Sequence, residues 1–149
     1  MKISCQLQEA DCSPEQVPES VQKFCGPAAP YAPEVDSDAD FVHAMRDLTR
    51  WHQQRSAWYA QLLDLHHVDV DALQTIEDVQ SLPTVHANFF KMHEVLSVPS
   101  SQVALHLTSS GTTGQKSQMF FDAFTIGNAR RMVDDVMAAR GIVSTQSAN

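Results

Sequence analysis

The sequence predicts an α/β protein in which a helix-rich first half is followed by a strand, a loop, a second strand and a helix. Two observations predict this order. Apolar residues recur at spacings of three, four and seven between residues 38 and 65, as in an amphipathic helix. Two short strand-like segments, residues 103–107 and 118–122, then flank a loop rich in glycine and hydroxyl side chains.

The size and charge of the chain restrict its class. With 149 residues, 43% of them hydrophobic, it can form one folded domain. The formal net charge is -8 and the 10 basic residues are dispersed, so we expect no nucleic-acid partner. No window approaches the ~18 apolar residues of a membrane span. The N-terminus has no continuous apolar region, so we expect no secretory signal. We therefore expect a cytoplasmic location.

Residues 1–37 differ from the rest in composition. They hold five of the seven prolines and all three cysteines, and they show little helical periodicity. We therefore expect an irregular N-terminal arm at 1–37 and a folded domain at 38–149. Without a secretory signal or a Cys-x-x-Cys spacing, the cysteines are expected to be free thiols.

The periodic segment predicts one helix of roughly seven turns, with Ser37 or Asp38 as its N-cap. Its apolar stripe is interpreted as a core face, and the members of the stripe are Phe41, Met45, Leu48, Trp51, Trp58, Leu62 and Leu65. Arg55 shares this face, so its guanidinium is expected to bind a carboxylate or a carbonyl.

Two further helices are predicted from their end signals. Thr75 is a candidate N-cap for a short helix that Pro83 cannot continue. Thr125 is a candidate N-cap for the last helix, and Gly141 is placed to terminate it. The segment between residues 85 and 98 is left unassigned.

The loop "LTSSGTTGQKS", Leu107–Ser117, carries most of the chemical information. Its glycines allow backbone amides to converge on an anion, its hydroxyls add donors, and its lysine adds a positive charge. The candidate phosphate-binding residues are Thr108, Ser109, Ser110, Gly111, Thr112, Thr113, Gly114, Lys116 and Ser117.

Other kinds of site fit less well. A Walker A loop requires Gly-Lys-Ser/Thr, but Gln115 separates Gly114 from Lys116, and a strand rather than a helix is predicted to follow. The Gly-x-Ser-x-Gly pattern of a nucleophile elbow is absent. The seven histidines form no His-Glu-x-x-His motif, so no metal ligands are assigned, and catalytic residues stay unknown.

Three stretches in order resemble a known family: residues 51–59 on the long helix, "SLPTVHANFFK" at 81–91, and the loop at 108–117 followed by Asp122. Together they resemble the LuxE-type acyl-protein synthetases of the adenylate-forming superfamily, with phenylacetate-CoA ligase as a more distant relative. The resemblance implies the N-terminal portion of an adenylate-forming ligase fold. It also implies ATP and Mg as cofactors, a fatty acid or other carboxylate activated as an acyl-adenylate, and a protein or thiol acceptor.

The sequence also departs from the superfamily. Many of its members have Thr-Gly-x-Pro-Lys, whereas this chain has Thr113-Gly-Gln-Lys116. The segments that bind adenine and Mg, the hinge and the acyl-accepting cysteine lie beyond such a loop and find no match here. We therefore expect an N-terminal part that is inactive alone. The alternative is a non-catalytic interaction module that retains the loop as a turn and self-associates through uncovered apolar faces.

Overall fold

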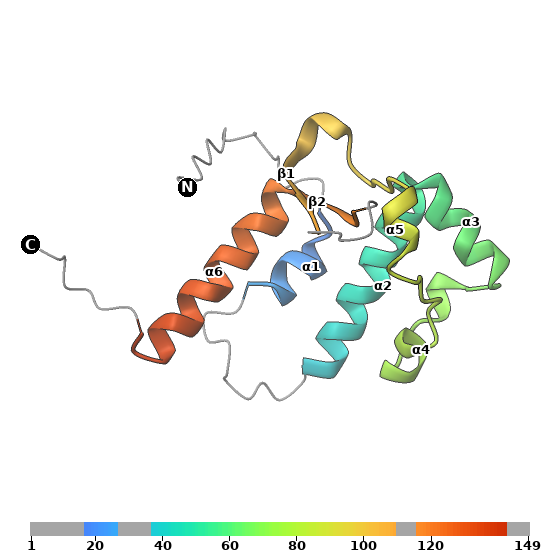
Figure 1. Cartoon of the computed structure of the whole chain (residues 1–149). Helices are drawn as coiled ribbons and strands as arrows, with labels where there is room; N and C mark the ends of the chain where they lie inside the picture. The colour runs from blue at the N-terminus through green and yellow to red at the C-terminus, as the bar shows by residue number, and fades with distance from the viewer. Residues whose placement is uncertain (1–16, 27–36, 110–115, 143–149) are drawn as a thin grey trace, which may run out of the picture.

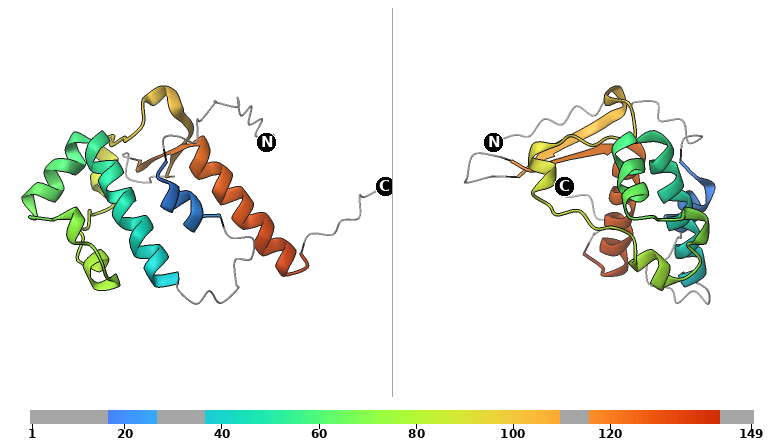
Figure 2. Two further views of the ribbon diagram at one scale, coloured as in Figure 1. Left: turned by 180° about the vertical axis from the view of Figure 1, so that it is seen from behind. Right: turned by 90° about the vertical axis from the view of Figure 1, so that its right-hand side faces the viewer.

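The computed structural model describes residues 17–26, 37–109 and 116–142 (Figure 1). Helices α2 (Ser37–Arg55) and α6 (Ala123–Ala139) are the two long elements, and α1 (Glu19–Phe24) lies between them. Strands β1 (Val103–Thr108) and β2 (Gln118–Asp122) form an antiparallel hairpin. Both strands contact α6, and in Figure 2 the hairpin lies beside the N-terminal end of that helix. The predicted α/β character is confirmed.

Helix α1 occupies part of the segment that was expected to be irregular. It packs on α2 through a Phe24–Phe41 ring contact with centroids 5.6 Å apart. The Ser20 hydroxyl donates to the Asp47 carboxylate at 2.7 Å. One turn further along α1, the Lys23 ammonium forms an ion pair with the Asp40 carboxylate at 3.2 Å. The arm is therefore not irregular throughout, because α1 has specific partners on α2. Residues 1–16 and 27–36 lie outside the described part.

The prediction of one seven-turn helix was wrong, because the helix breaks at Ser56. Helix α2 begins at Ser37 and ends at Arg55, and α3 spans Ala57–Leu65. Ser56 has extended backbone dihedrals, and its hydroxyl accepts from the Tyr59 amide at 3.3 Å, so it acts as the N-cap of α3. The break changes the register, and Leu65, expected in the core, is 75% exposed.

The tightest core lies where α3 meets the turn that follows it. Leu63 is 0% exposed and packs with two buried residues at a short 3-10 turn, η2 (Val70–Ala72). The other members of this cluster are Val70, Leu73, Tyr59, Val68 and Leu82.

The short helix α4 (Ile76–Gln80) follows η2 and confirms the predicted cap. The Thr75 hydroxyl accepts from the Asp78 amide at 3.1 Å, and the Asp78 carboxylate accepts from the Thr75 amide at 2.8 Å. Both bonds together form a capping box. The helix ends before Pro83, as predicted.

The unassigned middle segment contains little regular structure. It includes one turn of helix, α5 (Phe89–Met92), and a 3-10 turn, η3 (Ser100–Gln102), that leads into β1. Between them, residues 95–98 form an irregular connection that reaches back to α2, where Ser97 contacts His52.

The last helix was predicted correctly at its end and wrongly at its start. Asp122 rather than Thr125 is the N-cap of α6, because the Asp122 carboxylate accepts from the Thr125 amide at 2.8 Å. At the other end Gly141 has a φ of 64° and donates to Ala138 at 3.0 Å, while Ile142 donates to Met137. This is a Schellman termination, which favours glycine because of the positive φ.

Candidate functional site

The predicted phosphate loop joins β1 to β2, and its base is closed by hydrogen bonds. Thr108 pairs with Gln118 as the last rung of the hairpin. Beyond this rung the Ser109 amide donates to the Ser117 carbonyl at 3.0 Å, and the Ser117 amide donates to the Ser109 hydroxyl at 2.9 Å. The two ends of the loop are therefore fixed side by side.

Only the flanks of the loop are described. Ser110, Gly111, Thr112, Thr113 and Gly114 lie outside the described residues. Thr108, Ser109 and Lys116 are exposed, and Ser117 is half-buried.

The described flanks fit an anion through side chains rather than through the Ser117 amide, which is already bound to Ser109. The hydroxyls of Thr108 and Ser109 can each donate a proton, and the Lys116 ammonium carries three donors. Hydroxyl and ammonium donors suit phosphate oxygens, so these residues can hold part of a triphosphate.

The first two stretches of the resemblance contact one another. The ring of Phe89 in the "FFK" turn stacks on Trp58 of α3, with centroids 4.7 Å apart, and it also stacks on His93, with centroids 4.3 Å apart. Helix α5 also lies beside β2, the strand that leaves the loop. The chain thus brings its three distant stretches into one region.

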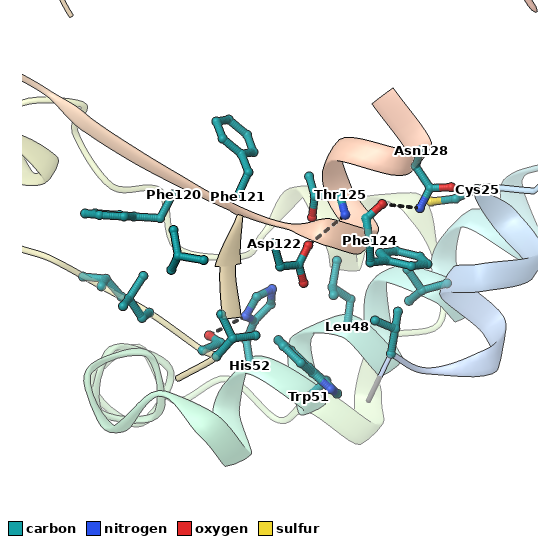
Figure 3. A pocket seen from close by; sticks show the side chains of 17 residues that line it. Cys25, Leu48, Trp51, His52, Phe120, Phe121, Asp122, Phe124, Thr125 and Asn128 are labelled. Carbon is teal, nitrogen blue, oxygen red and sulfur yellow. Dashed lines mark hydrogen bonds between the residues drawn. The ribbon is translucent and has the colours of Figure 1, made fainter. Parts of the chain in front are cut away.

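A cavity of about 360 Å³ opens at the other end of the hairpin (Figure 3). Its walls come from α1, the end of α2, residues 95–98, β2 and the start of α6. Phe120, the lining residue of β2 nearest the loop, lies two strand steps from Gln118, which is roughly 7 Å at about 3.4 Å per residue, and no described loop residue lines the cavity. The cavity is therefore a separate place from the phosphate loop.

Most of the lining is apolar, and its polar side chains include His52, Ser97 and Asp122. The His52 Nδ1 lies 2.7 Å from the Ser97 hydroxyl. The side chains of His52 and Asp122 point toward one another across the cavity (Figure 3). Aromatic and aliphatic neighbours complete the wall, among them Leu48, Trp51, Phe120, Phe121 and Phe124.

The environment of His52 favours the neutral imidazole. Burial lowers the pKa of His52 below its usual value, the nearby Arg55 guanidinium lowers it further, and the Asp122 carboxylate acts in the opposite direction. Arg55 itself lies 4.5 Å from the Trp51 ring centroid and donates to the Trp51 carbonyl, as the sequence predicted. A neutral imidazole can accept a proton near neutral pH.

Sequence reasoning did not find the group formed by His52, Ser97 and Asp122. The three residues come from α2, an irregular segment and the β2–α6 junction. No short-range spacing connects them, and only the tertiary packing brings them together.

Within 17–26, 37–109 and 116–142, no three His, Cys, Asp or Glu side chains are grouped to hold a metal ion. In the same ranges, no helix has the length and apolar character needed to cross a bilayer.

A comparison with protein families decides the assignment. The family model described as acyl-protein synthetase, LuxE, matches residues 27–147. The chain belongs to the LuxE acyl-protein synthetase family. The match contains the loop, His52, Ser97 and Asp122, whereas α1 lies before it. No curated protein and no solved structure matches the chain.

Proposed function

We propose that this chain serves ATP-dependent acyl-protein synthesis, in which a fatty acid or another carboxylate becomes an acyl-adenylate and then passes to a thiol or protein acceptor. Membership of the LuxE family carries this proposal, because the matched residues enclose the whole hydroxyl-glycine loop. The N-terminal portion of an adenylate-forming ligase fold is part of the same proposal.

The role assigned to the loop is to hold the triphosphate of ATP. Residues 108–117 would surround the β- and γ-phosphates, with Lys116 beside the negative charge that grows on the departing pyrophosphate. Fixed donors aimed at developing charge lower a barrier effectively, and removal of one donor commonly costs about 3–4 kcal/mol. Mg, expected to accompany the nucleotide, would neutralise part of the same phosphate charge.

The closed base of the loop supports this role. The two bonds between Ser109 and Ser117 fix where the loop leaves and rejoins the sheet. A site that is fixed before binding loses less conformational entropy when the ligand arrives. The side chains of Thr108, Ser109 and Lys116 remain exposed to a ligand.

The test is calorimetric titration of the chain with MgATP, with Lys116→Ala as the variant. Loss of one hydrogen bond to a charged group is worth about 1.5–3 kcal/mol, so Lys116→Ala should weaken binding by roughly 10- to 100-fold. Lys23→Ala is the matched control, because it removes the same charge from an exposed side chain on α1. Equal affinities for the two variants would contradict the assignment of the loop.

A second candidate is a non-catalytic interaction module, and helix α6 is the observation that favours it. No α6 side chain is buried, and Met132 and Val133 are 57% and 48% exposed. Apolar side chains exposed in this way can be covered by another copy of the chain. Sedimentation equilibrium over a range of concentrations tests this: a dimer that Met132→Gln dissociates, in a chain that does not bind MgATP, would favour the module over the ligase.

A further inference from the structure

We propose that Ser97, His52 and Asp122 form a second acyl-transfer site, in which the Ser97 hydroxyl attacks the carbonyl carbon of a neutral activated ester or thioester. The acyl chain of that substrate would occupy the cavity beside His52. This activity is distinct from adenylate formation and does not use the phosphate loop.

The contact between nucleophile and base is the first support. Ser97 Oγ lies 2.7 Å from His52 Nδ1, which is within the reach needed for proton transfer. Burial of His52 favours the neutral ring, and only a neutral ring can accept the serine proton. The ring is further held by contacts with Trp51 and Tyr59, with centroids 4.9 and 5.9 Å away.

A carboxylate in the right place is the second support. Asp122 faces the imidazole in Figure 3, and its charge raises the pKa of His52 against the larger effect of burial. A carboxylate beside the ring stabilises the imidazolium that forms when the serine loses its proton. Asp122 is itself fixed, because its other role is to cap α6 through the Thr125 amide.

The third support is the cavity. Its volume of about 360 Å³ falls within the range of small-molecule sites. Apolar side chains dominate the lining, while the Asp122 carboxylate would repel a free carboxylate. A short acyl chain that carries a neutral ester or thioester therefore fits better than the free acid.

An oxyanion needs donors near the nucleophile. Among the described residues, the amides of Ser97 and Val98 donate to no backbone carbonyl. They adjoin the nucleophile and can donate to the oxygen of a carbonyl under attack, as backbone amides do in acyl-transfer enzymes.

The reaction balances without any further reagent except water. Ser97 Oγ bonds to the carbonyl carbon while its proton passes to His52 Nδ1. The bond from that carbon to the leaving alcohol or thiol breaks, and His52 returns the proton to the leaving atom. Water then attacks the acyl-serine ester with His52 as base, releasing the carboxylic acid and restoring the hydroxyl.

The experiment treats the chain with a fluorophosphonate probe, and separately with p-nitrophenyl hexanoate, and maps the adduct by peptide mass spectrometry. The expected result is covalent modification at Ser97 and release of nitrophenol. Ser97→Ala should lose both signals, and His52→Gln should slow them by about 10²- to 10⁴-fold, the usual contribution of a general base. Ser100→Ala, an exposed serine in the next turn, is the matched control and should behave as the unmodified chain.

A positioning role for Asp122 is tested through the pH profile of probe labelling. The charged and titratable groups around the imidazole are Arg55 of α2, Tyr59 of α3 and Asp122 itself. Asp122→Asn removes the one effect that raises the pKa of His52, so the midpoint of the profile should move to lower pH while the plateau rate falls. A merely structural role for Asp122 would leave the midpoint in place.

Two results would overturn the proposal. One is a folded chain whose Ser97 takes up no probe. The other is labelling of Ser97 that His52→Gln does not slow, because the hydrogen bond would then only join residues 95–98 to α2. Ser97→Cys keeps a nucleophile if Ser97→Ala fails to fold, and it should be alkylated by iodoacetamide faster than Cys25.

Discussion

Replacement of Leu63 by alanine should destabilise the chain more than other leucine truncations on the same helix. Leu63 is 0% exposed and packs with Val70 at 6% and Leu73 at 4%. Truncation of such a side chain loses transfer free energy and leaves a cavity that its neighbours fill only in part. Buried leucine-to-alanine changes cost about 2.7–5.0 kcal/mol. We expect about 3 kcal/mol or more here, because Leu63 has no exposed surface.

The assay is reversible urea and thermal unfolding followed by circular dichroism. For a chain of this size each kcal/mol lowers Tm by about 2–4 °C, so a loss of about 3 kcal/mol corresponds to roughly 6–12 °C. The control is Leu65→Ala, two positions along α3, where the side chain is 75% exposed and the cost should stay within about 0.5 kcal/mol. Equal losses for the two variants would refute the position of the break at Ser56.

Two further predictions concern a helix cap and a buried imidazole. Thr75→Ala removes the hydroxyl of the capping box and should cost about 1 kcal/mol in urea unfolding; the exposed Thr84→Ala is the control, and a loss no larger than the control's would argue against the cap. The folded-state pKa of His52 lies below its unfolded value, so the unfolded chain binds more protons as pH falls below about 6.5, and stability should decrease there. Unfolding measured from pH 7.5 to 5.5 should show a smaller decrease in His52→Gln; the same decrease in both proteins would contradict the burial of this ring.

The elements that the sequence predicted well are those with short-range physical causes. The capping box at Thr75, the end of α6 at Gly141 and the hairpin around the loop each depend on a few adjacent residues. Asp122 and Thr125 lie three positions apart and are both favourable N-cap residues, so the local sequence does not show which of them caps α6. The carboxylate of Asp122 reaches the Thr125 amide, and the helix therefore begins earlier.

The break at Ser56 shows the limit of periodicity. Apolar spacing continues across the serine, and the pattern alone cannot show that its hydroxyl will cap a new helix. After the break, the buried face of α3 contains Leu63, which packs onto the turn at η2, and not Leu65.

The cavity site illustrates a different limit. His52 and Ser97 are 45 positions apart and meet only because residues 95–98 return to α2. The phosphate loop is different, because the order of its residues alone predicts the candidate phosphate-binding residues and the family resemblance. The family match over 27–147 confirms the resemblance. The phosphate contacts themselves stay a prediction.

The central claim is that residues 108–117 hold a triphosphate, and the most direct measurement is the amide NMR spectrum during titration with magnesium tripolyphosphate. We predict saturable shifts at Thr108, Ser109 and Ser117, with the amides of α4 unchanged at the same concentrations. Lys116→Ala should raise the concentration needed for half-saturation. Unshifted loop amides at millimolar tripolyphosphate, or shifts in Lys116→Ala equal to those of the unmodified chain, would contradict the claim.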